Sequence, residues 1–141
     1  MHILVVGDIT DAQIERLREL YEQKYSEPLD GKVVRLTHDQ AEKIADFYRV
    51  SVPLEPTWDK LAILSGVLRG ITGEVVDFTE LIVVHDKVSL GLLHNTRMPR
   101  GFTIIPAHKD IFIDDQGGAY MLGSDSHSSP AKTTYEPLGQ V

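Results

Sequence analysis

The chain has 141 residues, 42% of them hydrophobic and 25% charged, which suits one folded domain or two small lobes and disfavours disorder of the whole chain. It has no cysteine, which excludes disulfides and thiolate metal sites, and its formal net charge of −7 disfavours nucleic acid as a partner. The apolar run at the N-terminus is too short for a signal peptide, and no stretch approaches the roughly 20 apolar residues of a membrane span, so we expect a soluble protein without a membrane partner.

The chain begins with one short strand and a well-marked helix. Residues 2–6 are apolar and β-branched and end at Gly7-Asp8, which predicts a buried strand with a turn behind it. Thr10 and Gln13 have the spacing of a capping box. Apolar residues then recur at helical intervals, so we expect a helix over residues 11–25.

Two further helices are expected before Gly73. Residues 32–36 form a strand or an extended link, and Thr37 and Gln40 repeat the capping-box pattern ahead of a helix over 38–49. After a linker stiffened by two prolines, a third helix begins near Trp58. It is apolar on most sides, so we expect it to pack centrally or at a subunit interface.

After Gly73 the apolar residues recur with a period of two, which is typical of strands. From Gly123 the composition is polar and rich in Ser, Thr, Pro and Gly, which predicts a flexible tail or docking arm. The sequence therefore predicts an α+β protein with a mainly helical region (1–73), a β module forming a small antiparallel sheet or sandwich (74–122) and a tail (123–141). The expected strands are 75–76, 81–84, 88–93, 102–105, and a hairpin of 111–113 and 119–122 around a glycine turn.

The six histidines are the first candidates for chemistry: His2, His38, His85, His94, His108 and His127. The obvious metal-binding group near them is His108, Asp110, Asp114 and Asp115. However, no pair of histidines has helical ligand spacing, and neighbouring strand residues point to opposite faces. We therefore interpret these residues as solvated loop residues, and assign no catalytic, cofactor-binding or metal-ligating residue and no cofactor.

Phosphodiester chemistry has one partial signature. Paired His-x-Thr motifs can supply an acid and a base across a cleft, but His94-Asn95-Thr96 has no second copy. The turn after residues 2–6 has one glycine and no phosphate-binding lysine, and there is no Gly-x-Ser-x-Gly. A hydrolase that uses His38, His85 or His94 is thus a third-ranked hypothesis.

The charge distribution singles out one segment. No Asp or Glu occurs between Lys87 and Lys109, although Arg97 and Arg100 lie there too. This basic segment can meet an acidic partner or nucleic acid, or its charges can pair with the Asp-rich hairpin at 110–115. The sequence leaves both interpretations open and favours the second.

The most distinctive stretch is His94-Asn95-Thr96-Arg97-Met98-Pro99-Arg100-Gly101-Phe102. It resembles a β module of tailed-bacteriophage virion proteins that reads approximately His-Asn-Leu-Gly-Arg-x-Pro-Arg-Gly-Phe. Thr96 stands where that family has Leu-Gly, so one residue is missing at the turn. The resemblance covers about residues 74–122 and implies a non-catalytic structural role, commonly in a symmetric oligomer.

The leading hypothesis is therefore a bacteriophage structural protein of the tail or head, in the virion or the host cytoplasm, that assembles with itself or with other virion proteins. A second hypothesis is a small acidic phage regulator that binds and inhibits a host protein. The candidate interface residues are Trp58, Leu61, Leu64, Leu68, His94, Arg97, Arg100 and Phe102.

Overall fold

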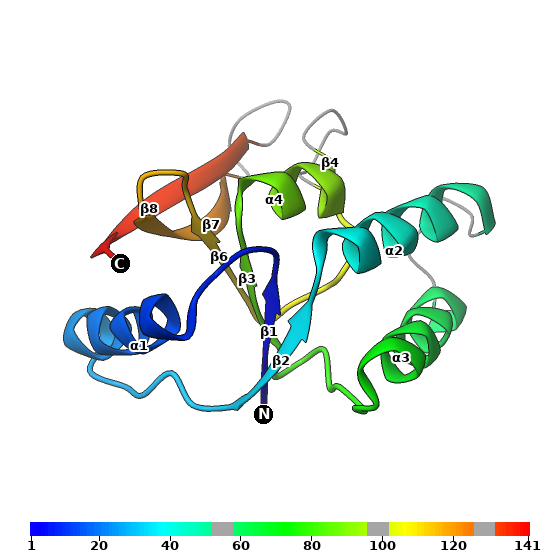
Figure 1. Ribbon diagram of the computed structural model, residues 1–141, viewed down its shortest axis with the longest axis horizontal. Coiled ribbons are helices and arrows are strands. Elements are labelled where there is room, and N and C mark those ends of the chain that lie inside the picture. The colour runs from blue at the N-terminus through cyan, green and yellow to red at the C-terminus, as the bar shows by residue number, and fades with distance from the viewer. Residues whose placement is uncertain (52–57, 96–101, 126–131) are drawn as a thin grey trace.

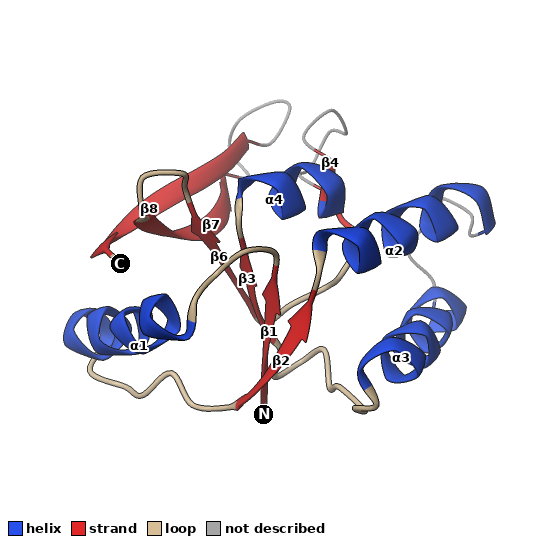
Figure 2. Cartoon of the chain, viewed as in Figure 1, coloured by secondary structure: helices blue, strands red, loops and turns tan. Residues whose placement is uncertain are grey.

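A computed structural model of the protein describes residues 1–51, 58–95, 102–125 and 132–141 (Figure 1). Helices and strands alternate in the first part of the chain, and strands dominate the last part (Figure 2). In chain order the elements are β1 (His2–Val6), α1 (Asp11–Tyr25), β2 (Lys32–Leu36), α2 (His38–Ser51), α3 (Trp58–Thr72), β3 (Ile82–His85), α4 (Lys87–Leu93), β4 (His94–Asn95), β5 (Phe102–Thr103), β6 (Lys109–Ile113), β7 (Gly118–Asp125) and β8 (Lys132–Gln140).

One six-stranded sheet forms the centre of the molecule, with the order β2-β1-β3-β6-β7-β8. The pairs β2–β1, β1–β3 and β3–β6 are parallel, whereas β6–β7 and β7–β8 are antiparallel. Helix α1 covers one face, and α2, α3 and α4 lie on the other (Figure 1). Because both faces are covered, β1 and β3 are apolar at almost every position rather than at alternate ones.

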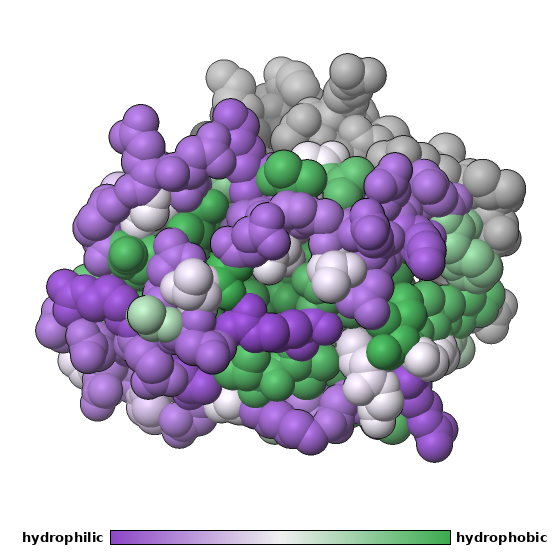
Figure 3. All heavy atoms as spheres, viewed as in Figure 1, coloured by the Kyte–Doolittle hydropathy of each residue, from purple (hydrophilic) through white to green (hydrophobic). Residues whose placement is uncertain are grey.

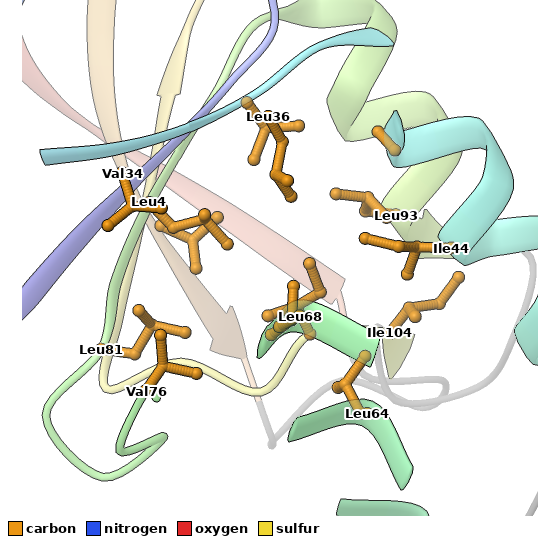
Figure 4. Packing of buried hydrophobic residues seen from close by; sticks show 14 of the residues in the cluster. Leu4, Val34, Leu36, Ile44, Leu64, Leu68, Val76, Leu81, Leu93 and Ile104 are labelled. Carbon is orange, nitrogen blue, oxygen red and sulfur yellow. The ribbon is translucent and has the colours of Figure 1, made fainter. Parts of the chain in front are cut away.

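Two hydrophobic clusters fill the two faces. Alternate residues of β1 point in opposite directions, so Val5 packs on the α1 face and Leu4 on the α2–α3 face. Figure 4 shows the second cluster, in which Leu64 and Leu68 of α3 point toward the side chains from the sheet and from α2. Leu64 is 2% and Leu68 0% exposed, so these two candidate interface residues lie in the core of the chain itself.

The helices before Gly73 agree with the sequence patterns. Helix α1 spans the expected residues, and both halves of its capping box form: the Gln13 amide donates to Thr10 Oγ1 (3.1 Å) and the Thr10 amide to Gln13 Oε1 (3.0 Å). The same pair of bonds joins Thr37 and Gln40. The hairpin around Asp114–Gly118 is confirmed as β6–β7, with Gly117 at a φ of 80°.

Two expected strands are wrong. Residues 88–93 lie in the helix α4, because Asp86 caps its N-terminus by accepting from the Ser89 amide (2.9 Å). A short apolar run has no period that separates a buried helix from a buried strand. Val75 and Val76 lie outside any strand; Val76 packs into the core from a loop, and Val75 is exposed.

The expected sheet architecture also needs correction. The fold is mixed α and β, but four neighbouring strands of the sheet, β2-β1-β3-β6, pair in parallel rather than antiparallel. The sheet also takes β1 and β2 from before Gly73. Parallel strands need a crossover of a dozen or more residues. Helix α1 lies in the crossover from β1 to β2, α2 and α3 in the one from β2 to β3, and α4 in the one from β3 to β6. Helical and strand-rich segments are therefore layers of one sheet-centred arrangement.

The polar end of the chain is a strand where a flexible tail was expected. Strand β8 pairs antiparallel with β7, and Leu138 is buried against the α1 face. Lys24 Nζ of α1 donates to the Pro137 carbonyl (2.7 Å), and Tyr25 Oη donates to Glu136 Oε2 (3.1 Å). The expectation of a flexible tail from residue 123 is thus wrong for residues 123–125 of β7 and 132–140 of β8, and residues 126–131 lie outside the described part. Docking of this segment to a partner stays a prediction.

The surface is uneven in polarity. Hydrophilic residues gather over the side where α1 lies, whereas hydrophobic residues show around α3 on the opposite side (Figure 3). Ile63 of α3 is among the exposed large hydrophobic residues. Within the described ranges, none of the helices combines the length and the apolar character that crossing a membrane requires.

Candidate functional site

The sheet contains one topological switch point, between β1 and β3. The chain leaves β1 through α1 on one face to reach β2, and leaves β2 through α2 and α3 on the other face to reach β3. The connections therefore diverge beyond the carboxyl ends of β1 and β3. In open α/β sheets this divergence creates the crevice in which ligands bind.

Three titratable side chains meet at this crevice, and we call Asp8, His38 and Asp86 the switch-point cluster. Asp8 follows β1, His38 follows β2 and Asp86 follows β3. His38 Nε2 is 2.5 Å from Asp86 Oδ2, and His38 Nδ1 is 3.8 Å from Asp8 Oδ2. The imidazole of His38 therefore lies between two carboxylates.

The backbone fixes the Asp86 carboxylate. It accepts from the amide of Asp8 (2.9 Å) and from the amide of Ser89 (2.9 Å) as the N-cap of α4. Gly7, with a φ of 101°, leaves the space that the carboxylate fills, because a Cβ at residue 7 would overlap Asp86. The Gly7-Asp8 turn thus presents the Asp8 amide as a donor and leaves room at Gly7 for the Asp86 carboxylate that accepts from it.

Charge in the cluster follows from these contacts. The hydrogen bond to Asp86 raises the pKa of His38, and the negative charges of Asp86, Asp8 and Asp39 add to this effect against the opposing effect of burial. Burial alone would raise the pKa of Asp86, but the amides of Ser89 and Asp8 outweigh it, so the pKa is lowered. Both directions favour an imidazolium beside a carboxylate, and an imidazolium can donate a proton.

The switch-point cluster lines a polar cavity of about 320 Å³. Its wall also carries the side chains of Gln13, Lys87, Asp114 and Asp115. Lys87 Nζ is 3.3 Å from Asp115 Oδ2, so the one lysine among the lining residues is paired. The carboxylates outnumber the cationic groups on the wall, so the cavity attracts positive charge.

A second group lies on the α2–α3 face of the sheet, and we call His85, His94 and Asp110 the buried cluster. His85 Nε2 is 3.1 Å from Asp110 Oδ1, and His94 Nε2 is 3.8 Å from Asp110 Oδ2. Burial lowers the pKa of His85 despite the carboxylate beside it. Burial alone would raise the pKa of Asp110, but the two imidazoles outweigh it and the pKa is lowered.

The structure does not bring together the metal-binding group that the sequence suggested. Asp110 joins His85 and His94 rather than His108, and Asp114 accepts from the amides of Gln116 and Gly118 in the β6–β7 turn. Leu61 is half-buried. Trp58 and Phe102 begin α3 and β5, with side chains outside the described part, and Arg97 and Arg100 lie outside the described residues.

Asp8 and Asp86 are the candidate functional residues that the sequence reasoning missed. Each aspartate lies two residues after the last valine of an apolar strand. This signal is visible in the sequence as Val-Val-Gly-Asp for Asp8 and Val-Val-His-Asp for Asp86. The two lysines that bound the basic segment pair with different acidic residues. Lys87 pairs with Asp115 of the acidic hairpin, as one of the two sequence-based interpretations of this segment expects. Lys109 pairs with Glu27 (3.1 Å).

The stretch from His94 to Phe102 that resembles a phage virion module lies mostly outside the described residues, at 96–101. The phage interpretation therefore stays a prediction. In comparisons of the chain with protein-family models, with curated proteins and with solved structures, none of the three gave a match.

Proposed function

We propose that the protein is an enzyme that hydrolyses a phosphodiester at the switch-point cluster. In this proposal His38 is the general acid, and Asp86 is a positioning residue that holds its imidazole. The observation that carries the proposal is the 2.5 Å contact between His38 Nε2 and Asp86 Oδ2 at the carboxyl end of parallel strands. This is the third of the hypotheses from the sequence, with His38 taken from its three candidate histidines.

Accessibility supports a catalytic role for His38 over a purely structural one. Its side chain is 30% exposed and lines the cavity, so a substrate can reach it. Its raised pKa favours the protonated ring, and the amides that fix Asp86 also fix the direction of the ring. A positioned acid with a pKa near the working pH typically contributes about 10² to 10⁴ in rate.

The charge of the cavity favours a phosphodiester over a phosphate with more negative charges. A bare phosphate group would be repelled by Asp8, Asp86, Asp114 and Asp115. A phosphodiester has one negative charge, so its complex with Mg²⁺ is net positive and is attracted. Nucleotides bind at switch points of other open α/β sheets, which is support by analogy of fold alone.

The reaction balances with the groups at this site. A water oxygen bonds to phosphorus, and the bond from phosphorus to the leaving oxygen breaks with its electron pair on that oxygen. His38 gives the proton of Nδ1 to the leaving oxygen and becomes neutral, while Nε2 keeps its proton and its hydrogen bond to Asp86. The proton lost by the attacking water returns to His38, so the products are a phosphomonoester and an alcohol.

The test is hydrolysis of a dinucleoside monophosphate in the presence of Mg²⁺, because its leaving group is an alkoxide that needs a proton. We expect turnover by the wild-type chain and strong loss in Asp86→Asn, whose amide leaves His38 without its charged partner. His2→Asn is the matched control, since His2 lies at the opposite end of β1. A folded wild-type chain that turns over no phosphodiester, or an Asp86→Asn variant as active as His2→Asn, overturns the proposal.

Assembly into a bacteriophage particle stays a prediction from the sequence. It does not conflict with catalysis, because the switch-point cluster consists of Asp8, His38 and Asp86, and the interface prediction uses none of these residues. Mass spectrometry of purified particles tests it separately from the enzyme assay.

A further inference from the structure

The buried cluster leaves nitrogen atoms in the interior without hydrogen-bond partners. His85 is 0% exposed, and the side chain of His94 is 8% exposed. Among the described residues, His85 Nδ1 and His94 Nε2 have no hydrogen-bond partner. Buried polar atoms are almost always paired in folded proteins, so an unpaired His94 Nε2 only 3.8 Å from Asp110 Oδ2 requires an explanation. His85 faces Asp110 with its other ring nitrogen, Nε2, so Nε2 is its candidate ligand atom.

The ligand atoms of the cluster have the spacing of a metal site. One ligand atom from each residue lies within 4.8 Å of the other two. His85 Nε2 is 3.1 Å from Asp110 Oδ1, and His94 Nε2 is 3.8 Å from Asp110 Oδ2. Zinc holds nitrogen and oxygen ligands at about 2.0–2.1 Å, so two ligand atoms of one tetrahedral ion are about 3.3 Å apart. The separations in the cluster bracket this value.

The fold converges these three side chains from separate elements. Asp110 of β6 pairs with Val83 of β3, so His85, two residues further along β3, lies on the same face of the sheet as Asp110. His94 follows α4, and its ring meets the edge of the His85 ring at an interplanar angle of 82°. The two imidazoles thus approach one carboxylate from a strand and from a helix end.

We propose that His85, His94 and Asp110 bind one zinc ion. Two imidazoles and a carboxylate form a donor set that favours zinc over magnesium or calcium, which prefer oxygen ligands. Three protein ligands leave a fourth position open, as in catalytic zinc sites. This site shares no residue with the switch-point cluster and does not depend on the proposed function.

The open coordination position of the proposed zinc ion lies beside a cavity. His94 and Asp110 line a cavity of about 400 Å³, together with Thr103, His108 and Thr133. A water molecule or a small oxygen ligand from this cavity can complete the coordination. The ion would also tie β4, at the end of α4, to the central sheet, so its binding stabilises the folded chain.

The test is titration of the full chain with zinc alone after dialysis against a chelator, followed by calorimetry and thermal unfolding. We expect about one equivalent of zinc to bind and the Tm to rise. His94→Gln and Asp110→Asn should each weaken zinc binding by roughly 10-fold or more. His38→Gln should leave it unchanged, because this variant disturbs the only other candidate cluster among the described residues.

Two results overturn the proposal: a folded wild-type chain that binds no zinc, and a chain whose zinc binding is lost in His38→Gln but kept in His94→Gln. If His94→Gln fails to fold, X-ray absorption of the zinc-loaded wild-type chain decides the question. Two imidazoles and one carboxylate in the first coordination sphere support the site, and one imidazole or none overturns it.

Discussion

His85 and Asp86 are consecutive residues whose side chains belong to different clusters. His85 Nε2 lies 3.1 Å from Asp110 Oδ1, whereas Asp86 Oδ2 lies 2.5 Å from His38 Nε2. His85 ends β3 and keeps the alternation of the strand, whereas Asp86 leaves the strand and caps α4. One strand end therefore supplies both the proposed metal site and the proposed catalytic site.

Gly7→Ala should damage the switch-point cluster and the fold together. The added Cβ would overlap the Asp86 carboxylate, and a φ of 101° is strained for alanine. The positive φ alone should cost an alanine roughly 1–2 kcal/mol of stability, and displacement of Asp86 adds to this cost. We expect a lower urea midpoint and loss of phosphodiester hydrolysis.

Gly66→Ala is the matched control for that variant. Gly66 lies within α3, and, apart from its chain neighbours and the nearby backbone of its own helix, no described atom lies within 4 Å of the position where its Cβ would be. Alanine in a helix interior is favoured over glycine by about 0.5–1 kcal/mol, so stability should rise slightly. Equal midpoints for the two variants would show that Gly7 has no special backbone role.

The raised pKa of His38 predicts a pH dependence of stability. The folded chain holds the proton of His38 to higher pH than the unfolded chain, in which the pKa is about 6.5. The stabilisation is therefore complete below that pH and is lost as the pH rises through the folded value. Asp86, Asp8 and Asp39 are the charged groups responsible.

The measurement is the urea unfolding of the wild type and of His38→Gln between pH 5 and pH 9. The free-energy difference between the two should be largest at the acid end of this range and should shrink as the pH rises. A difference that grows with pH would mean that the ring is held neutral in the folded chain.

Leu68→Ala should test the core beneath the α2–α3 face. Leu68 is fully buried among side chains of the sheet and of α2, and removal of a buried leucine typically costs about 2–5 kcal/mol. Ile63→Ala, on the exposed side of the same helix, should cost well under half of that. A Leu68→Ala variant as stable as Ile63→Ala would contradict the packing in Figure 4.

Deletion of residues 132–141 should destabilise the chain, because β8 supplies a strand to the sheet and Leu138 to the core. It also removes the contacts of Lys24 and Tyr25 with this strand. Chemical denaturation should show a lower midpoint and a smaller m-value, since less surface is buried. Unchanged unfolding would restore the interpretation of this segment as a free tail.

Local signals in the sequence predicted local structure well. Thr10 and Thr37 with their glutamines marked the starts of α1 and α2, because a capping box is complete within four residues. The strand prediction for residues 88–93 was wrong because their helix depends on Asp86 as a cap, and the apolar residues alone have no period that distinguishes a helix from a strand.

The sheet order and the two clusters were not predicted, because they depend on pairing between residues far apart in the chain. The parallel order of β1, β3 and β6 joins segments far apart in the chain, and the residue pattern of a buried strand does not specify its neighbour. The two clusters depend on this order, since His85 and Asp110 meet through the β3–β6 register and Asp8 meets Asp86 across β1 and β3. The expected group of His108 with three aspartates was based on proximity in sequence alone.

The most direct measurement of the proposed function compares two phosphodiesters in His38→Gln. A dinucleoside monophosphate releases an alkoxide and needs a general acid, whereas bis(p-nitrophenyl) phosphate releases a phenolate that does not. We predict that kcat/KM falls by about 10² to 10⁴ for the first substrate and by much less for the second. Equal losses for the two substrates, or no loss for either, would contradict the role of His38.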